Sequence, residues 1–155
     1  EAQLDRFMVR ASIGYPNRDE ESALLDRFRA GENPDAMSPS ATVADVVRAR
    51  KTVDEVAVND TVREYLLDII AATRSAASLR LGASPRASLA LQHAAQGRAA
   101  MQGRSYVIPD DVKSLAVPVL AHRLLAESTT ELRGMATAQI ISEIVESTPV
   151  PIERE

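Results

Sequence analysis

The sequence predicts an all-α protein, a small helical bundle preceded by one short strand. Aromatic residues make up only 3% of the 155 residues, so side chains that favour strands are scarce. Apolar residues recur at helical spacing in several stretches, and residues that start or stop helices bracket those stretches. These observations favour short helices that each hide one face against their neighbours.

The first element expected is a strand over residues 7–13, where apolar side chains occupy every second position. The Gly-Tyr-Pro-Asn sequence at 14–17 then ends it. No convincing second strand lies nearby to pair with this one, and a lone strand leaves its backbone groups unmatched. We therefore expect its sheet partners to lie upstream of Glu1, in which case the chain is a C-terminal piece of a longer protein.

Helices are expected to follow one another along the rest of the chain, several of them starting at a residue that caps orphan backbone N–H groups. The expected starts are Asn17, Thr42, Asn59, Ser84 followed by Pro85, Pro109 followed by two aspartates, and a last helix through the apolar positions of 138–145. Gly31 and Gly103 are expected to end two of them. Segments 56–58 and 106–108 read as extended and 81–83 as a turn, while 31–40 and 127–134 read as loop and polar stretch.

Composition excludes several classes of function. The net charge of −4 gives no overall attraction to nucleic acid or anionic lipid, so we expect neither nucleic acid binding nor membrane insertion. The absence of cysteine excludes disulfides, thiolate zinc sites and thiol nucleophiles, and a count of only two histidines argues against a multi-histidine metal centre. Neither Lys51 nor Lys113 follows a glycine, so the chain carries no phosphate-binding P-loop of its own.

Four segments, taken together and in order, resemble the C-terminal part of the MoxR-type AAA+ ATPases. They are EAQLDRF at 1–7, GYP at 14–16, GASPRA at 82–87 and GRSYVIPDDV at 103–112. The resemblance implies that residues 1–16 are the end of an α/β nucleotide-binding core and that residues 17–155 are the helical lid of this family, with the sensor-2 segment and the C-terminal tail.

The same resemblance implies what the whole protein does. Such proteins assemble into rings, commonly hexamers, and hydrolyse ATP with Mg²⁺ to remodel or mature partner proteins in the cytoplasm. The P-loop would lie in the missing N-terminal core. We therefore expect the 155 residues alone neither to bind ATP appreciably nor to hydrolyse it.

Arg6 matches the family's arginine-finger position. A finger is a guanidinium from the adjoining subunit that meets the charge spread over the γ-phosphoryl oxygens in the transition state. Sequence chemistry alone offers another interpretation, a surface ion pair of Arg6 with Glu1 or Asp5 that contributes about 0–1 kcal/mol.

Arg86 matches the sensor-2 position, where it would contact the γ-phosphate of ATP. Its place in the first turn of a helix is unfavourable for a cation, and a bound phosphate would relieve that conflict. The alternative is an arginine that points into solvent. A lid arginine that touches only ATP would let hydrolysis move the lid, with 14–16 as a candidate hinge or a simple turn.

Other polar residues have plainer interpretations. His93 and His122 are expected to be structural or exposed. Asp110 and Asp111 could imitate a metal pair, but we expect them to stabilise the start of a helix. Ile108, the residue before that helix, cannot accept a capping hydrogen bond through its side chain.

A rival hypothesis comes from a different class of protein. The acidic balance, the apolar stripes and the lack of a complete catalytic set would also suit a free-standing helical module that binds proteins and never meets nucleotide. The basic cluster Arg48, Arg50 and Lys51 is expected to be a solvated helix face, or else a contact for a partner.

Overall fold

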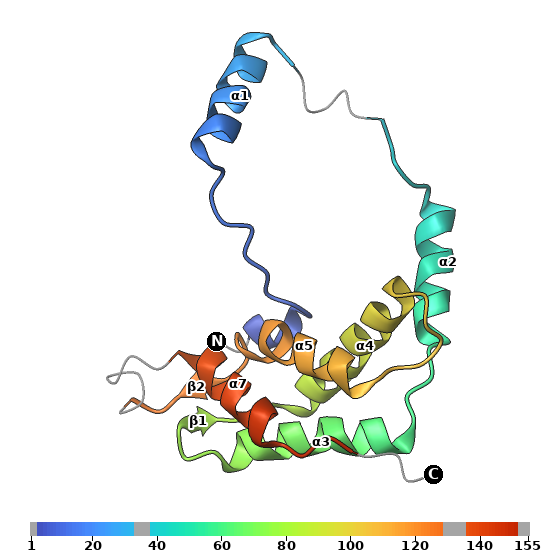
Figure 1. Ribbon diagram of the computed structural model, residues 1–155, viewed down its shortest axis with the longest axis vertical. Coiled ribbons are helices and arrows are strands. Elements are labelled where there is room, and N and C mark those ends of the chain that lie inside the picture. The colour runs from blue at the N-terminus through green and yellow to red at the C-terminus, as the bar shows by residue number, and fades with distance from the viewer. Residues whose placement is uncertain (1–2, 33–37, 129–135, 152–155) are drawn as a thin grey trace.

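The structure is a computed structural model that describes residues 3–32, 38–128 and 136–151, and it is mostly helical (Figure 1). Its helices are η1 (Leu4–Arg6, a 3-10 turn), α1 (Arg18–Arg29), α2 (Val43–Asp54), α3 (Asp60–Ser75), α4 (Pro85–Met101), α5 (Pro109–Leu120) and α7 (Thr137–Ser147). Two short strands, β1 (Leu79–Leu81) and β2 (Leu125–Ala126), pair antiparallel although α4 and α5 lie between them in the sequence. The predicted class, a small helical bundle, is confirmed.

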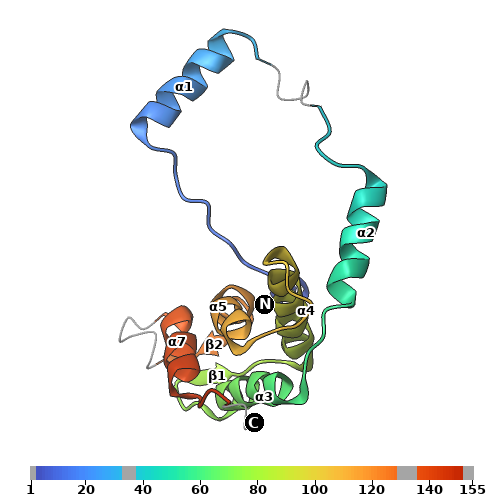
Figure 2. The same ribbon diagram turned by 45° about the vertical axis from the view of Figure 1, so that its right-hand side comes forward.

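The bundle consists of α3, α4, α5 and α7, with α2 packed along one side of α4 (Figures 1 and 2). Its core is aliphatic, as the apolar stripes of the sequence indicate. The fully buried side chains include Ile69, Ile70, Leu91, Val112, Leu120 and Ile141. Helix α4 lies at the centre because its buried face is mostly alanine, which lets α5 and α3 approach it closely.

The helix starts follow the predicted capping chemistry. Side-chain oxygens of Asn17, Thr42, Asn59 and Ser84 accept hydrogen bonds from backbone N–H groups in the first turns of α1, α2, α3 and α4. The end of α4 is also as expected, because Gly103 takes a positive φ of 71°, which residues with a Cβ rarely adopt.

The predicted strand over 7–13 does not form among the described residues. The backbone is extended at Phe7, but no neighbouring strand pairs with this segment. Its backbone groups turn to the bundle instead: the Arg10 N–H donates to the Pro118 carbonyl at 2.9 Å, and the Phe7 carbonyl accepts from His122 Nε2 at 2.9 Å. An extended segment becomes a strand only beside a partner, and none is present here.

Helix α1 has an apolar face that nothing in the described chain covers. Leu24, Leu25 and Phe28 are 62%, 70% and 85% exposed, and α1 lies away from the bundle in both views (Figures 1 and 2). The sequence correctly predicts the helix and its apolar face. The expectation that such a face packs within the chain does not hold for α1.

Three smaller expectations have mixed outcomes. Segments 56–58 and 106–108 are extended and meet at one parallel bridge between Ala57 and Tyr106. The turn expected over 81–83 begins instead with the end of β1, a strand that the sequence does not predict. Residues 33–37 of the expected loop and 129–134 of the expected polar stretch lie outside the described residues.

Candidate functional site

The two arginines singled out by sequence, Arg6 and Arg86, line the same cleft although they are far apart in the chain. The cleft has a volume of about 320 Å³ and lies between η1 and the first turns of α4. Both arginine side chains are exposed. The other residues that line the cleft are Asp5, Met8, Leu89, Ala90, Gln92, His93 and Arg123.

The start of α4, which carries Arg86, is fixed against the end of α3. The Ala83 N–H donates to Thr73 Oγ1 at 3.0 Å, and Arg74 Nε donates to the Ala83 carbonyl at 2.8 Å. A Cβ added to Gly82 would lie 2.6 Å from Arg74 Cα, so only glycine allows this approach. These contacts leave little freedom in where α4 begins, and Arg86 follows two residues after its Ser84 cap.

The segment that carries Arg6 is attached to the same cap. Ser84 Oγ lies 3.1 Å from both carboxylate oxygens of Asp5, to which it donates, and it accepts from the Ala87 N–H at 3.2 Å. Arg123 also holds Asp5, with its NH1 group 2.9 Å from Oδ1. Asp5 therefore joins η1, the cap of α4 and the end of α5.

Charge in the cleft is predominantly positive. Among the described residues, no carboxylate lies within ion-pair distance of Arg6 or Arg86, and the Asp5 carboxylate is engaged by Arg123. The sequence offered Glu1 and Asp5 as ion-pair partners for Arg6. Asp5 is paired with Arg123 instead, and Glu1 lies outside the described residues. A cleft with exposed guanidinium groups attracts anions, above all those with several oxygens.

Asp111, considered above as half of a metal pair, is instead locked inside the bundle. It accepts two hydrogen bonds of 2.7 Å from the guanidinium of Arg104 and one of 3.0 Å from the Ile108 N–H, and Arg98 lies 3.3 Å away. Burial by itself raises the pKa of this carboxyl, but the hydrogen bonds and the two cations outweigh burial and lower it. Asp111 thus stabilises the start of α5, as expected, and it does so from a buried position.

The structure shows no metal site in the part of the chain that it describes. No three histidine or carboxylate side chains there are grouped so that they could share an ion. His93 Nε2 lies 3.5 Å from Asp54 at the surface, and Asp110 is largely exposed beside Lys113. The helices of the described residues are also too short or too polar to cross a membrane.

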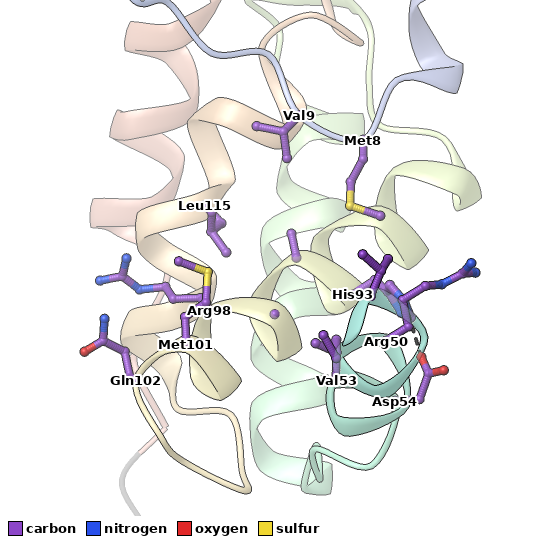
Figure 3. A pocket seen from close by; sticks show the side chains of 14 residues that line it. Met8, Val9, Arg50, Val53, Asp54, His93, Arg98, Met101, Gln102 and Leu115 are labelled. Carbon is purple, nitrogen blue, oxygen red and sulfur yellow. Dashed lines mark ion pairs between the residues drawn. The ribbon is translucent and has the colours of Figure 1, made fainter. Parts of the chain in front are cut away.

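A second, larger hollow is an apolar groove of about 680 Å³ between α2 and α4 (Figure 3). Val53 of α2, Met101 of α4 and Leu115 of α5 line it, and Met8 and Val9 close one end. Of the basic cluster, Arg50 reaches the rim of this groove. Arg48 pairs with Asp45, and Lys51 with Glu55, on the exposed side of α2, as a solvated face would.

Sequence reasoning did not single out Arg123 or Arg104, the two arginines with the most structural contacts. One signal was available for Arg123, because it interrupts the apolar run 115–126. A charge within such a run is either buried with partners or marks the end of a helix. Its partners Asp5, Phe7 and Met8 lie 115 to 118 residues away in the sequence, which no local pattern indicates.

Comparison with known proteins adds the following. Residues 71–144 match the family described as AAA lid domain. The chain is 36% identical over 154 residues to the uncharacterized protein YeaC of Bacillus subtilis and 30% identical over 160 residues to chaperone MoxR1 of Mycobacterium tuberculosis. A crystal structure of a candidate ATPase from Cytophaga hutchinsonii, 27% identical, superimposes on 97% of the chain with a TM-score of 0.87.

The chain covers only part of these proteins. It spans about half the length of the curated relatives that it matches, 48% of YeaC and 42% of MoxR1, while nearly the whole chain, 99% and 97%, takes part in the match. It likewise covers 48% of the solved Cytophaga chain.

Proposed function

Because the chain belongs to the MoxR-type AAA+ ATPases and corresponds to their C-terminal part with its lid, we propose that it contributes two phosphate-contacting arginines to a ring-forming ATPase. Arg6 is the arginine finger that acts on a neighbouring subunit's ATP, and Arg86 is the sensor-2 arginine. The observation that carries the proposal is that both side chains are exposed and line one cleft.

The chemistry fits a nucleotide that is losing its γ-phosphoryl group. In the transition state negative charge spreads over the phosphoryl oxygens, and a planar guanidinium can donate two parallel hydrogen bonds to them. A finger of this kind accelerates hydrolysis about 10³- to 10⁵-fold in other phosphoryl-transfer systems. Arg86 adds a second cation at a helix N-terminus, which itself attracts anions.

We infer that the two arginines reach the same nucleotide. Both line one cleft of one chain, which supports a common phosphate approached from one side. A finger that acts on the neighbouring subunit's ATP therefore implies that Arg86 acts on that ATP too. Loss of the γ-phosphate then removes contacts between the lid and the neighbouring subunit's nucleotide. Because ATP and ADP contact the lid differently, hydrolysis changes the position of the lid relative to that neighbour. The movement would remodel a bound partner protein.

The test uses the full-length protein with Mg²⁺ and ATP. Replacing Arg6 by alanine should leave ATP binding unchanged and lower kcat by about 10³-fold or more. Arg86→Ala should lower kcat or abolish the ATP-dependent shift of the lid. Arg80→Ala, which removes an exposed arginine on β1 outside the cleft, is the matched control and should behave as wild type. Unchanged turnover in Arg6→Ala would remove the finger assignment.

Mixed rings test which subunit the arginines serve. Subunits with Arg6→Ala keep their own ATP site, while subunits whose P-loop lysine is replaced keep their finger. If the finger acts on a neighbour, mixing the two inactive proteins restores hydrolysis at their shared interfaces. The same mixture made with Arg86→Ala should also regain activity. A mixture that stays inactive for Arg86 would place this arginine at its own subunit's nucleotide.

One observation favours the rival function, a helical module that binds proteins and no nucleotide: the exposed apolar face of α1. The two hypotheses differ in what is encoded upstream of Glu1. The ATPase proposal expects the pattern GxxxxGK[ST] there. It also expects calorimetry to detect no micromolar binding of ATP to the 155-residue chain alone.

A further inference from the structure

Arg123 is a buried cation whose donors all point toward the segment around Arg6 or back to the last turn of α5. It follows the end of α5, and only 2% of its side chain is exposed. Burying a guanidinium is costly unless its donors are matched. Here Nε donates to the Val119 carbonyl at 2.9 Å, NH1 donates to the Asp5 carbonyl at 2.7 Å, and NH2 donates to the Phe7 carbonyl.

These contacts hold Arg6 from both sides. Asp5 and Phe7 are its two neighbours in the chain, and one guanidinium binds the backbone carbonyls of both. Because the partners are backbone atoms, the Arg6 main chain is held on both sides while η1 is docked on the bundle. The Arg6 side chain can still change rotamer.

The same guanidinium also engages the carboxylate next to Arg6. Asp5 Oδ1 accepts from Arg123 at 2.9 Å, and both of its carboxylate oxygens accept from Ser84 at 3.1 Å. Ser84 caps the helix that carries Arg86. Asp5 is therefore not available to neutralise Arg6, and it ties η1 to the helix start two residues before Arg86.

We propose that Arg123 is a positioning residue for the ATPase, which aligns Arg6 with Arg86 on one phosphate and keeps Asp5 from pairing with Arg6. The proposal rests on the proposed function of Arg6. Arg123 itself does not touch the nucleotide. Its effect passes entirely through the main chain at Asp5 and Phe7 and through the Asp5 carboxylate.

The decisive variant is Arg123→Lys in the full-length ATPase. Lysine keeps the charge, but its single ammonium group cannot span the Val119, Asp5 and Phe7 carbonyls at once. Misplacing a catalytic group by about 1 Å can cost about 10²-fold in rate. We expect kcat to fall by about 10- to 100-fold while the KM for ATP changes by less than about threefold.

Arg104→Lys is the matched control. Arg104 is the other arginine of the bundle that makes a two-pronged contact, but it binds Asp111, away from η1. Lysine there should lower the melting temperature, as Arg123→Lys should, and leave kcat within about twofold of wild type. If both variants lower kcat equally at equal loss of stability, Arg123 is merely structural and the proposal is wrong.

A double-mutant cycle separates this proposal from the finger assignment. If Arg123 acts through Arg6, then adding Arg123→Lys to Arg6→Ala should cost no further rate in single-turnover hydrolysis of radiolabelled ATP, which can follow residual activity. Independent, multiplying losses overturn the positioning role. If Arg6→Ala alone has no effect, it is the finger assignment that fails.

Asp5→Asn keeps the proposal falsifiable should Arg123→Lys not fold. Asparagine retains an oxygen that can accept from Ser84 but loses the carboxylate that Arg123 holds. It should lower kcat, again without further loss on top of Arg6→Ala. A kcat within about twofold of wild type overturns the proposal.

Discussion

Replacing the buried Asp111 by alanine should strongly destabilise the bundle. The carboxylate is 1% exposed and has three hydrogen-bond donors around it. Alanine leaves the Arg104 guanidinium without its partner and the Ile108 N–H without its acceptor. Burial of the new methyl group offers little in return.

The structure sets the expected size of the loss. Breaking a buried ion pair by removing one partner costs about 3–5 kcal/mol. The Arg104 side chain is 23% exposed, so it can turn partly toward water, which favours the lower end of that range. We therefore expect the free energy of unfolding to fall by about 3 kcal/mol, equivalent to a drop in melting temperature of roughly 12–24 °C for a bundle of this size.

Urea unfolding of the 155-residue chain, followed by far-UV circular dichroism, measures this change. The control is Asp110→Ala, the neighbouring aspartate in the same first turn, which is 78% exposed and pairs loosely with Lys113 at 3.7 Å. Its removal should lower the free energy of unfolding by about 1 kcal/mol or less. A loss below about 1 kcal/mol for Asp111→Ala would refute the argument that Asp111 locks the bundle.

Three further predictions concern the stability of the chain. The pKa of Asp111 lies below its ordinary value of 3.8. The stability that ionised Asp111 contributes is therefore complete above pH 3.8 and is lost as the pH falls below that value. The difference in free energy of unfolding between wild type and Asp111→Asn should shrink in acid titrations below about pH 4. Gly82→Ala should lower the free energy of unfolding by at least about 2 kcal/mol, because the new Cβ would lie 2.6 Å from the Arg74 backbone. In the same urea assay, Gly97→Ala in α4 should raise the free energy of unfolding by about 0.5–1 kcal/mol, because a Cβ at that position would have open space around it. Phe28→Ala should change it by less than about 0.5 kcal/mol in that assay, since Phe28 is 85% exposed; a larger loss would show that α1 packs against the bundle in solution.

Local chemistry made most of the fold predictable. Helix starts depend on one side chain and the N–H groups within three residues of it, and the caps at Asn17, Thr42, Asn59 and Ser84 follow from the sequence. Features that depend on distant partners were not predictable in the same way. The segment 7–13 has the alternation of a strand, but alternation does not supply a neighbour to pair with.

The residues of the candidate site also differ in how far the sequence indicates them. Motif resemblance picked out Arg6 and Arg86, and the structure adds that they line one cleft. Arg123 left only the signal of a charge inside an apolar run, because its partners lie at the other end of the chain. The strands β1 and β2 have only three and two residues, too short for a period to be recognised.

The contact of Arg123 with Asp5 joins residues that are 118 positions apart, and this separation has a consequence for the order of folding. Two of the contacts that fix the bundle are much more local: Arg104 meets Asp111 across seven positions, and Thr73 meets Ala83 across ten. Since distant contacts form only after a large loss of chain entropy, η1 should dock last, onto a bundle that is already assembled. A segment that docks last can also detach without unfolding the rest. The segment that carries Arg6 can thus attach to the bundle or leave it at a fraction of the free energy that holds the bundle together.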